Sequence, residues 1–258
     1  MPQNGRLEEF LNRKVKEYNT PQFIESDPVC IPHAFSKKQD IEIAAFFAAI
    51  LAWGNRTIII RKSRELMALM DNSPHDFCLD PGKEGLKRIS EFKHRTFNAT
   101  DILYFVHFLQ HHYTVSDTLE TAFTRGMHVK DATTENGLRE FHRYFFALED
   151  APLRTRKHIA TPAKKSTCKR LNMFLRWMVR QDKAGVDFGL WRHISPAQLV
   201  CPIDLHVARV AEKFRLVNRK QTDWQAALDL TQNLKKFCPE DPVKYDFALF
   251  GLGVVEKF

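Results

Sequence analysis

A chain of 258 residues with 44% hydrophobic and 12% aromatic residues can bury a sizeable core, which excludes an intrinsically disordered protein. Its ten glycines argue against a glycine-rich phosphate-binding loop. The formal charge of +8 is local, because residues 151–181 hold nine Lys or Arg and no acid, which leaves −1 for the rest. Such a cationic segment is typical of proteins that bind phosphate, although a solvated basic loop has the same composition.

The five cysteines lie far apart without a C-x-x-C pair. We therefore expect a reduced, cytoplasmic protein with no disulfide framework, iron–sulfur cluster, zinc site or other metal or cofactor. The N-terminus lacks the apolar stretch of a signal peptide, and the longest apolar run, 41–53, is shorter than the roughly 20 residues that span a bilayer. We expect no membrane partner and no obligatory protein partner.

Apolar residues recur at helical spacing along the chain, without a long period-2 strand or an internal repeat. The expected helices span residues 40–52, 57–71, 99–113, 117–125, 135–148, 164–181, 204–216, 223–237 and 242–251, with a short turn or helix at 195–196. The pattern predicts an all-α protein, which we treat as one unit over 1–258. We expect two packed helical subdomains with a cleft between them and a basic linker near 151–163.

Local signals mark several helix ends. Ser36 to Gln39 matches a capping box for the first of these helices, and Gly54 is placed to end it. Ser73–Pro74 is expected to end the helix 57–71. Asn98 to Asp101 is expected to open the helix 99–113. Asp241 is expected to cap the last helix, with Pro242 in its first turn. The apolar helix 40–52 is expected in the middle of the fold.

Asp204 is the most informative acid of the chain, since it stands as a natural N-cap before a run of apolar residues at helical spacing. Backbone N–H groups orient a carboxylate at this position, so it can be aimed at a group outside the helix. Lys169 lies in the cationic segment, where neighbouring cations and partial burial favour a neutral, nucleophilic amine. The plainer interpretations are a phosphate-contacting lysine and a helix cap with no further role.

Two further motifs hold candidate site residues. Trp53, Asn55 and Arg56 stand at the end of the apolar helix and are candidates for stacking on a base or filling a gap in a duplex, unless they only pack there. His107 and His111 share a helix face at the spacing of metal ligands, but no third ligand lies near them in the sequence. Ring packing or an exposed face explains these histidines better.

Residues 202–210, P-I-D-L-H-V-A-R-V, resemble the P-(V/I)-D-x-H-V-x-R-V segment of the helix-hairpin-helix DNA glycosylase superfamily. Residues 49–57 resemble its LSxQxT helix end, and 247–251 resemble its late helix; the similarity runs from about residue 40 to the end. The aspartate of the first segment is catalytic in that superfamily, and Asp204 occupies the matching place. The whole chain also resembles an uncharacterised bacterial family.

The chain departs from the superfamily pattern at its hairpin, because L-P-G-V-G-x-K-T-A is absent and the C-terminal cluster cysteines are missing. The resemblance is nearest in style to the archaeal 8-oxoguanine branch, whose lysine lies in a K-x-x-x-F-x-x-K helix. Residues 169–176 are similar to that helix, with Phe174 one place late and Arg176 at the second cationic position. The resemblance thus implies Lys169 as the nucleophile, with Lys165 as the alternative.

The function that this resemblance implies is a base-excision DNA N-glycosylase with AP-lyase activity, acting on damaged duplex DNA through a Lys169 Schiff base assisted by Asp204. The residues expected to contact the nucleic acid are Trp53, Asn55, Arg56, Lys164, Lys165, Arg170, Arg176 and His206. A non-catalytic helical protein that binds DNA or RNA is the alternative, with Asp204 acting only as a cap. A helical interaction or scaffold protein is the third class.

Overall fold

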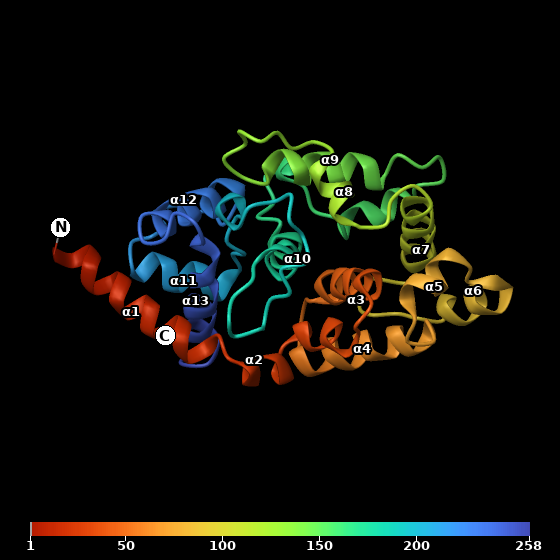
Figure 1. Ribbon diagram of the computed structural model, residues 1–258, viewed down its shortest axis with the longest axis horizontal. Coiled ribbons are helices and arrows are strands. Elements are labelled where there is room, and N and C mark those ends of the chain that lie inside the picture. Colours follow the sequence, from red (N-terminus) through yellow and green to blue (C-terminus); the bar gives the residue numbers. More distant parts are fainter. Residues whose placement is uncertain (1) are drawn as a thin grey trace. The chain divides into compact units, whose positions relative to one another are not determined.

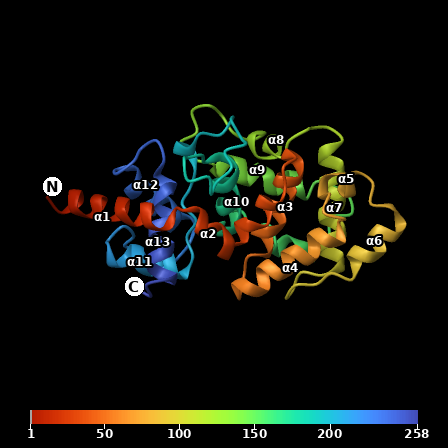
Figure 2. The ribbon, with the colours of Figure 1, turned by 60° about the horizontal axis from the view of Figure 1, so that its bottom comes forward.

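The structure is a computed structural model that describes residues 2–258 (Figures 1 and 2). The protein is all-helical, and no strand occurs within the described residues. The chain forms two compact units. The first consists of the chain up to Phe23, Val129–Glu135 and Thr161–Phe258, and the second of Ile24–His128 and Asn136–Ala160. The boundary at 160/161 lies inside the basic stretch that was expected to be a linker.

Helices of the first unit gather around α13. The elements are α1 (Pro2–Tyr18), η4 (Pro162–Lys164), α10 (Lys169–Val179), η5 (Pro196–Gln198), α11 (Leu205–Lys213), α12 (Trp224–Lys235), η6 (Pro242–Lys244) and α13 (Tyr245–Val254). Both α1 and α11 pack on α13 (Figure 1). The close approach of α1 depends on Gly251, where a Cβ would lie 2.2 Å from the Tyr18 ring.

The second unit surrounds the apolar helix α3. Its elements are η1 (Pro28–Cys30), η2 (Pro32–Ala34), α3 (Lys38–Leu51), α4 (Arg56–Leu69), α5 (Pro74–Leu79), α6 (Gly82–Ser90), α7 (Ala99–Tyr113), α8 (Glu120–Thr124), α9 (Glu135–Phe145, which enters from the other unit at its first residue) and η3 (Leu153–Lys157), while α2 (Pro21–Ser26) crosses the unit boundary. Every residue from Asp40 to Leu51 is buried, as the apolar pattern predicted. Phe46 stacks on Phe105 and meets Phe141 edge-on.

The most deeply buried carboxylate of this apolar helix, Glu42, is supplied with three donors. Glu42 accepts hydrogen bonds from the Tyr113 hydroxyl, the Thr118 hydroxyl and the Leu119 N–H, at 2.9, 2.6 and 2.9 Å. These bonds tie α3 to the end of α7 and the turn before α8. A buried carboxyl group that is hydrogen-bonded in this way stabilises one arrangement of the core instead of disrupting it.

Several predicted helix ends are confirmed and several are wrong. Helix α7 occupies 99–113 as predicted, with its capping box between Asn98 and Asp101. The predicted box at Ser36 is wrong, because Lys37 precedes α3 and no side chain caps that helix. Asp241 precedes η6 without a side-chain cap bond and instead accepts hydrogen bonds from the Arg180 Nε. Pro74 begins α5 at its first position instead of closing a helix.

The predicted single helix over 164–181 is also wrong. Residues 162–164 form a 3-10 turn, and Lys165 and Cys168 both have left-handed backbones, with φ of 59° and 51°. A left-handed residue cannot continue the α-helical hydrogen-bond ladder, so α10 starts only at Lys169. Within the part of the chain that the structure describes, no helix is both long and apolar enough to cross a bilayer.

Candidate active site

Lys169 and Asp204, which are 35 positions apart in the sequence, meet in the first unit. The Lys169 Nζ lies 3.7 Å from the Asp204 Oδ2, and the two side chains are 26% and 27% exposed. Both residues stand at helix starts, Lys169 at the first position of α10 and Asp204 at the N-cap of α11. The structure therefore brings together the two residues that the sequence selected as the reactive pair.

The two carboxylate oxygens of Asp204 have different partners. Oδ1 accepts hydrogen bonds from the backbone N–H groups of His206 and Val207, at 2.9 and 3.0 Å, which confirms the predicted N-cap. Oδ2 is the oxygen that faces the amine of Lys169. The cap fixes the carboxylate plane, and the second oxygen is left to act on a group outside α11. Capping and chemistry are thus compatible roles for one side chain.

The loop before Lys169 is strained and firmly held. Lys165 and Cys168 are non-glycine residues with left-handed backbones, a conformation that costs on the order of 1 kcal/mol or more each. The loop is held by a bond from the Trp224 N–H to the Lys165 carbonyl at 3.0 Å, and by one from the Asn172 side chain to the Thr167 carbonyl at 3.0 Å. Such strain clusters at functional sites, because the surrounding structure must impose it.

Lys169 also stands against the helix macrodipole, since the first turn of a helix favours negative and not positive charge. Stability alone therefore gives no reason for a lysine at this position. The sequence-based reason for a neutral amine was crowding by other cations. The structure shows a different environment, in which the Asp204 carboxylate faces the amine.

Arg176 does not lie on the surface, so its predicted phosphate contact is wrong. Its side chain is 5% exposed, and its Nε donates to Asp187 at 3.2 Å. Its Nη1 pairs with Asp246, and the guanidinium lies over the Phe247 ring at 4.3 Å from the centroid. The guanidinium is enclosed by these partners, which leaves it no route to a nucleic acid.

Arg180, one turn further along the chain, completes a buried cluster with Arg176. It pairs with Asp182, Asp187 and Asp241 at 2.6, 3.0 and 2.9 Å. The six residues Arg176, Arg180, Asp182, Asp187, Asp241 and Asp246 are called the Arg–Asp cluster below. Burial raises the pKa of Asp241 although the charge of Arg180 opposes this.

Asp246 connects this cluster electrostatically to the reactive pair. Burial raises the pKa of its carboxyl to about 6, while the positive charges of Arg176 and Lys169 lower it and the charge of Asp204 adds to the rise. Asp246 was read from the sequence only as part of an apolar helix. No local signal marked it, because the groups that act on it come from α10 and from the start of α11.

The other cations near Lys169 differ in exposure. Lys164 and Lys165 are exposed in the turn before α10, where a phosphate can reach them. Arg170 is only half-exposed, and burial lowers the pKa of its guanidinium to about 10. The phosphate contacts predicted for Lys164, Lys165 and Arg170 stay predictions.

His206 is exposed and lines a hollow of about 340 Å³ at the junction of α11 and α13. Arg209 and Lys257 contribute two further cations to the hollow, and Gly253 forms part of its wall. A Cβ at Gly253 would lie 3.1 Å from the His206 Cβ, so this glycine lets the two helices approach. Arg209 was not among the residues predicted to contact nucleic acid, although it lines this hollow beside His206. Its spacing of three from His206 on one helix face was the available signal.

Trp53, Asn55 and Arg56 belong to the second unit. Trp53 is half-exposed, and its ring packs against His94 and His158 at centroid distances of 5.0 and 5.8 Å. The Asn55 side chain caps α4 by accepting from the Ile58 N–H at 3.2 Å. Arg56 lines a groove on α4 that is described below. Asn55 therefore has a structural role, and the contacts of Trp53, Asn55 and Arg56 with nucleic acid stay predictions.

The histidines considered as metal ligands have other partners. The His107 Nδ1 lies 3.1 Å from the Asp150 Oδ2, and the His111 ring packs beside the Tyr144 ring at a centroid distance of 6.2 Å. Among residues 2–258, no group of three or more His, Cys, Asp or Glu side chains is placed to hold a metal ion.

Comparison with known proteins identifies the family of this chain. The family model described as "Protein of unknown function (DUF2400)" matches residues 27–255, which include every helix from α3 to α13. No curated protein and no solved structure matches the chain.

Proposed function

The chain belongs to the DUF2400 family, and from its Lys169–Asp204 pair we propose that it is a base-excision DNA glycosylase with AP-lyase activity. The observation that carries this proposal is the 3.7 Å contact between the Lys169 amine and the Asp204 carboxylate, on side chains that stay partly open to solvent. The resemblance of residues 202–210 to the helix-hairpin-helix glycosylases supports the assignment of Asp204.

In the proposed reaction, the lone pair of the Lys169 amine forms a bond to C1′ of the deoxyribose of an extruded nucleotide. The bond between C1′ and the base breaks, and the base leaves with the bonding electrons. Asp204 stabilises the positive charge that develops on the sugar and accepts the proton that the amine releases. Opening of the sugar ring then gives a Schiff base between Lys169 and C1′, from which β-elimination nicks the strand.

A structural ion pair explains the observations less well. An exposed pair of this kind contributes about 0–1 kcal/mol to stability, which does not account for the strained loop and the unfavourable helix position of Lys169. A catalytic pair accounts for the strained loop and the position of Lys169. Electrostatic stabilisation of a transition state requires groups that are held in place before the reaction begins.

DNA is the proposed substrate because of the cations that precede α10. Lys164 and Lys165 are exposed within five residues of Lys169. Lysines of this kind neutralise phosphates and give salt-dependent affinity that carries little sequence information. The cytoplasm, where such an enzyme meets DNA in a bacterium, is part of the same proposal.

The second candidate is a helical protein that binds DNA or RNA without catalysis. The observation that favours it is the N-cap of Asp204, which gives this carboxylate a complete structural role through His206 and Val207. In that case the pair with Lys169 only neutralises two neighbouring charges.

Borohydride trapping separates the two candidates. The full chain is incubated with duplexes that carry 8-oxoguanine, uracil, an alkylated base or an abasic site, and borohydride is added to reduce any Schiff base to a stable adduct. We expect an adduct with the wild-type protein on at least one duplex, and none with Lys169→Gln. Asp204→Asn should lower the rate about 100- to 1,000-fold, because it removes one charge-stabilising group.

Two matched controls accompany these variants. Lys164→Gln removes an exposed lysine from the same turn and should keep the adduct at saturating duplex, because Lys164 is proposed to bind phosphate and not to react. Lys165→Gln tests the alternative nucleophile. An adduct that survives Lys169→Gln contradicts the assignment of Lys169. The absence of an adduct on every duplex, combined with tight and salt-sensitive binding, supports the non-catalytic candidate instead.

A further inference from the structure

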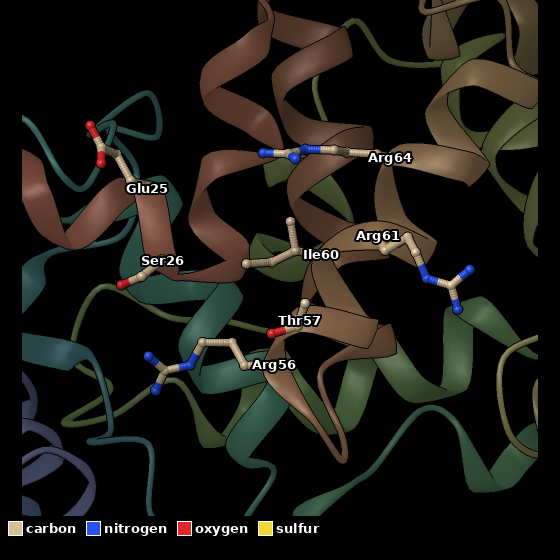
Figure 3. Close-up of a pocket in the computed structure, with 7 residues that line it drawn as sticks. All are labelled: Glu25, Ser26, Arg56, Thr57, Ile60, Arg61 and Arg64. Atoms are coloured by element: carbon tan, nitrogen blue, oxygen red, sulfur yellow. The ribbon is translucent and has the colours of Figure 1, made fainter.

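A groove of about 500 Å³ lies between α2 and the outer face of α4 (Figure 3). Three arginines of α4 line it, with two hydroxyl groups and one acid: Arg56, Arg61, Arg64, Ser26, Thr57 and Glu25. The groove lies entirely within the second unit, and it contains none of the residues of the proposed active site.

Two of these arginines are available to a ligand. Arg61 and Arg64 are exposed, and neither forms an ion pair with another residue between 2 and 258. The Arg64 guanidinium faces the thiol of Cys30, which is a weak acceptor. Both arginines of the Arg–Asp cluster, in contrast, are buried against two or more carboxylates. The groove therefore holds positive charge that the protein itself leaves without a partner of opposite charge.

The arrangement of the arginines fits a repeating anion better than a single one. Arg56 and Arg64 are eight residues apart, which is roughly 12 Å along the helix axis. Figure 3 shows their side chains extending toward the α2 side of the groove, while Arg61 points the other way. A nucleic acid strand presents several phosphates along its length, so different guanidiniums of this set can contact different phosphates.

The chemistry of the lining also suits phosphodiesters. Guanidinium groups bind phosphate oxygens through paired N–H donors, and hydroxyl groups such as those of Ser26 and Thr57 are common contacts of the phosphate backbone. Glu25 is the only acid in the lining, and its exposed position keeps it in contact with water. The groove thus carries a net positive charge with polar groups between the cations.

We propose that this groove on α2 and α4 binds consecutive phosphates of a nucleic acid strand and is a second contact surface for the substrate. This inference rests on the proposed function, because it assigns the groove to the same DNA. It adds Arg61 and Arg64 to the cations that the sequence selected, and it places a binding surface in the unit that lacks the reactive pair.

The test measures the affinity of the full chain for a fluorescent duplex that carries a stable abasic-site analogue, by anisotropy at several salt concentrations. The double variant R61Q/R64Q is compared with the wild type. K83Q/K87Q is the matched control, since it removes two exposed cations from α6 of the same unit, outside the groove. Arg56 is left unchanged, so the result concerns the two newly assigned residues only.

Each phosphate contact adds about 0.9 to the slope of log affinity against log salt. The slope of R61Q/R64Q should therefore be smaller by about 2, and the affinity ratio of wild type to variant should shrink about tenfold between roughly 50 and 200 mM salt. The control should keep the wild-type slope to within about 0.5. A double variant that behaves as the control does overturns the proposal and leaves the groove to another partner, such as an acidic peptide.

Free phosphate is tested with the same proteins. If inorganic phosphate or pyrophosphate raises the melting temperature of the wild type but not of R61Q/R64Q, while duplex affinity is the same for both, the groove binds a small anion and the proposal is wrong. Borohydride adducts are measured in parallel. A reduced slope without any adduct supports the groove and contradicts the glycosylase, whereas an unchanged slope with a normal adduct contradicts the groove alone.

Discussion

Helix α10 carries cations at both ends, and the two ends use them differently. At its start, Lys169 meets a single carboxylate at 3.7 Å, and both side chains are about one quarter exposed. At its end, Arg176 and Arg180 are at most 5% exposed and are bound by several carboxylates of the Arg–Asp cluster at shorter distances. The same residue types thus form an open pair at one end and a closed cluster at the other.

The difference in burial decides what each arrangement does. Charges that are removed from water must keep their partners, because an unpaired buried charge costs several kcal/mol. An exposed pair is worth about 0–1 kcal/mol, since water compensates either partner for the loss of the other. The Arg–Asp cluster is therefore suited to holding α10 and α13 together. Lys169 and Asp204, in contrast, can give up their mutual contact and bind a substrate instead, at little cost in free energy.

The largest expected effect comes from breaking the closed cluster. Arg176→Gln leaves Asp187 and Asp246 without their shared cation, and it should lower the free energy of unfolding by about 3–5 kcal/mol. Lys169→Gln should lower it by less than about 1 kcal/mol. Urea denaturation measures both. Equal losses of stability in the two variants would remove the distinction between the open pair and the closed cluster.

A smaller effect is expected from titration of Asp246. Its pKa is raised from 3.8 to about 6, so its contribution to stability is complete below about pH 4 and is lost as the pH rises through about 6. Asp246→Asn does not titrate. The stability of the wild type relative to this variant should fall by about 1–3 kcal/mol between these pH values. Urea denaturation across this range checks the direction, and a relative stability that rises with pH would contradict it.

The smallest effect separates the two roles of Asp204. Asparagine caps helices about as well as aspartate, so Asp204→Asn should keep the stability of α11 to within a few tenths of a kcal/mol. Asp204→Ala should lose about 1 kcal/mol, because the N–H groups of His206 and Val207 lose their acceptor. Thermal unfolding measures this difference. Both variants should lose the borohydride adduct to a similar extent. If Asp204→Asn keeps the adduct, helix capping is the only role left for Asp204.

Local patterns in the sequence predicted what depends on near neighbours. The cap of Asp204 and the start of a helix at Asn98 depend on residues no more than three positions apart, and both predictions are confirmed. The burial of α3 follows from its apolar residues alone. Signals of the same kind failed where the competing contact is distant: Asp241 looks like a helix cap, but Arg180 binds its carboxylate from 61 positions away.

Arg176 shows why the charge run 151–181 was misread in part. From the composition of this segment, Arg176 was expected to contribute to a charged surface. In the structure, every residue from Leu171 to Val179 is buried. The apolar residues on both sides of Arg176 were a signal against an exposed position. Its partners Asp187 and Asp246 lie 11 and 70 positions away, so no local pattern could identify them.

The sequence by itself determined the all-helical class, the core position of the helix 40–52, the capping role of Asp204 and the concentration of cations in 151–181. These properties follow from spacing, capping and composition, which act over one or two helical turns. Only the tertiary structure decided which cations stay in water. It buried Arg176 among carboxylates, left Arg61 and Arg64 in an open groove, and placed the Lys169 amine beside Asp204, because burial and ion pairing depend on which distant segments pack together.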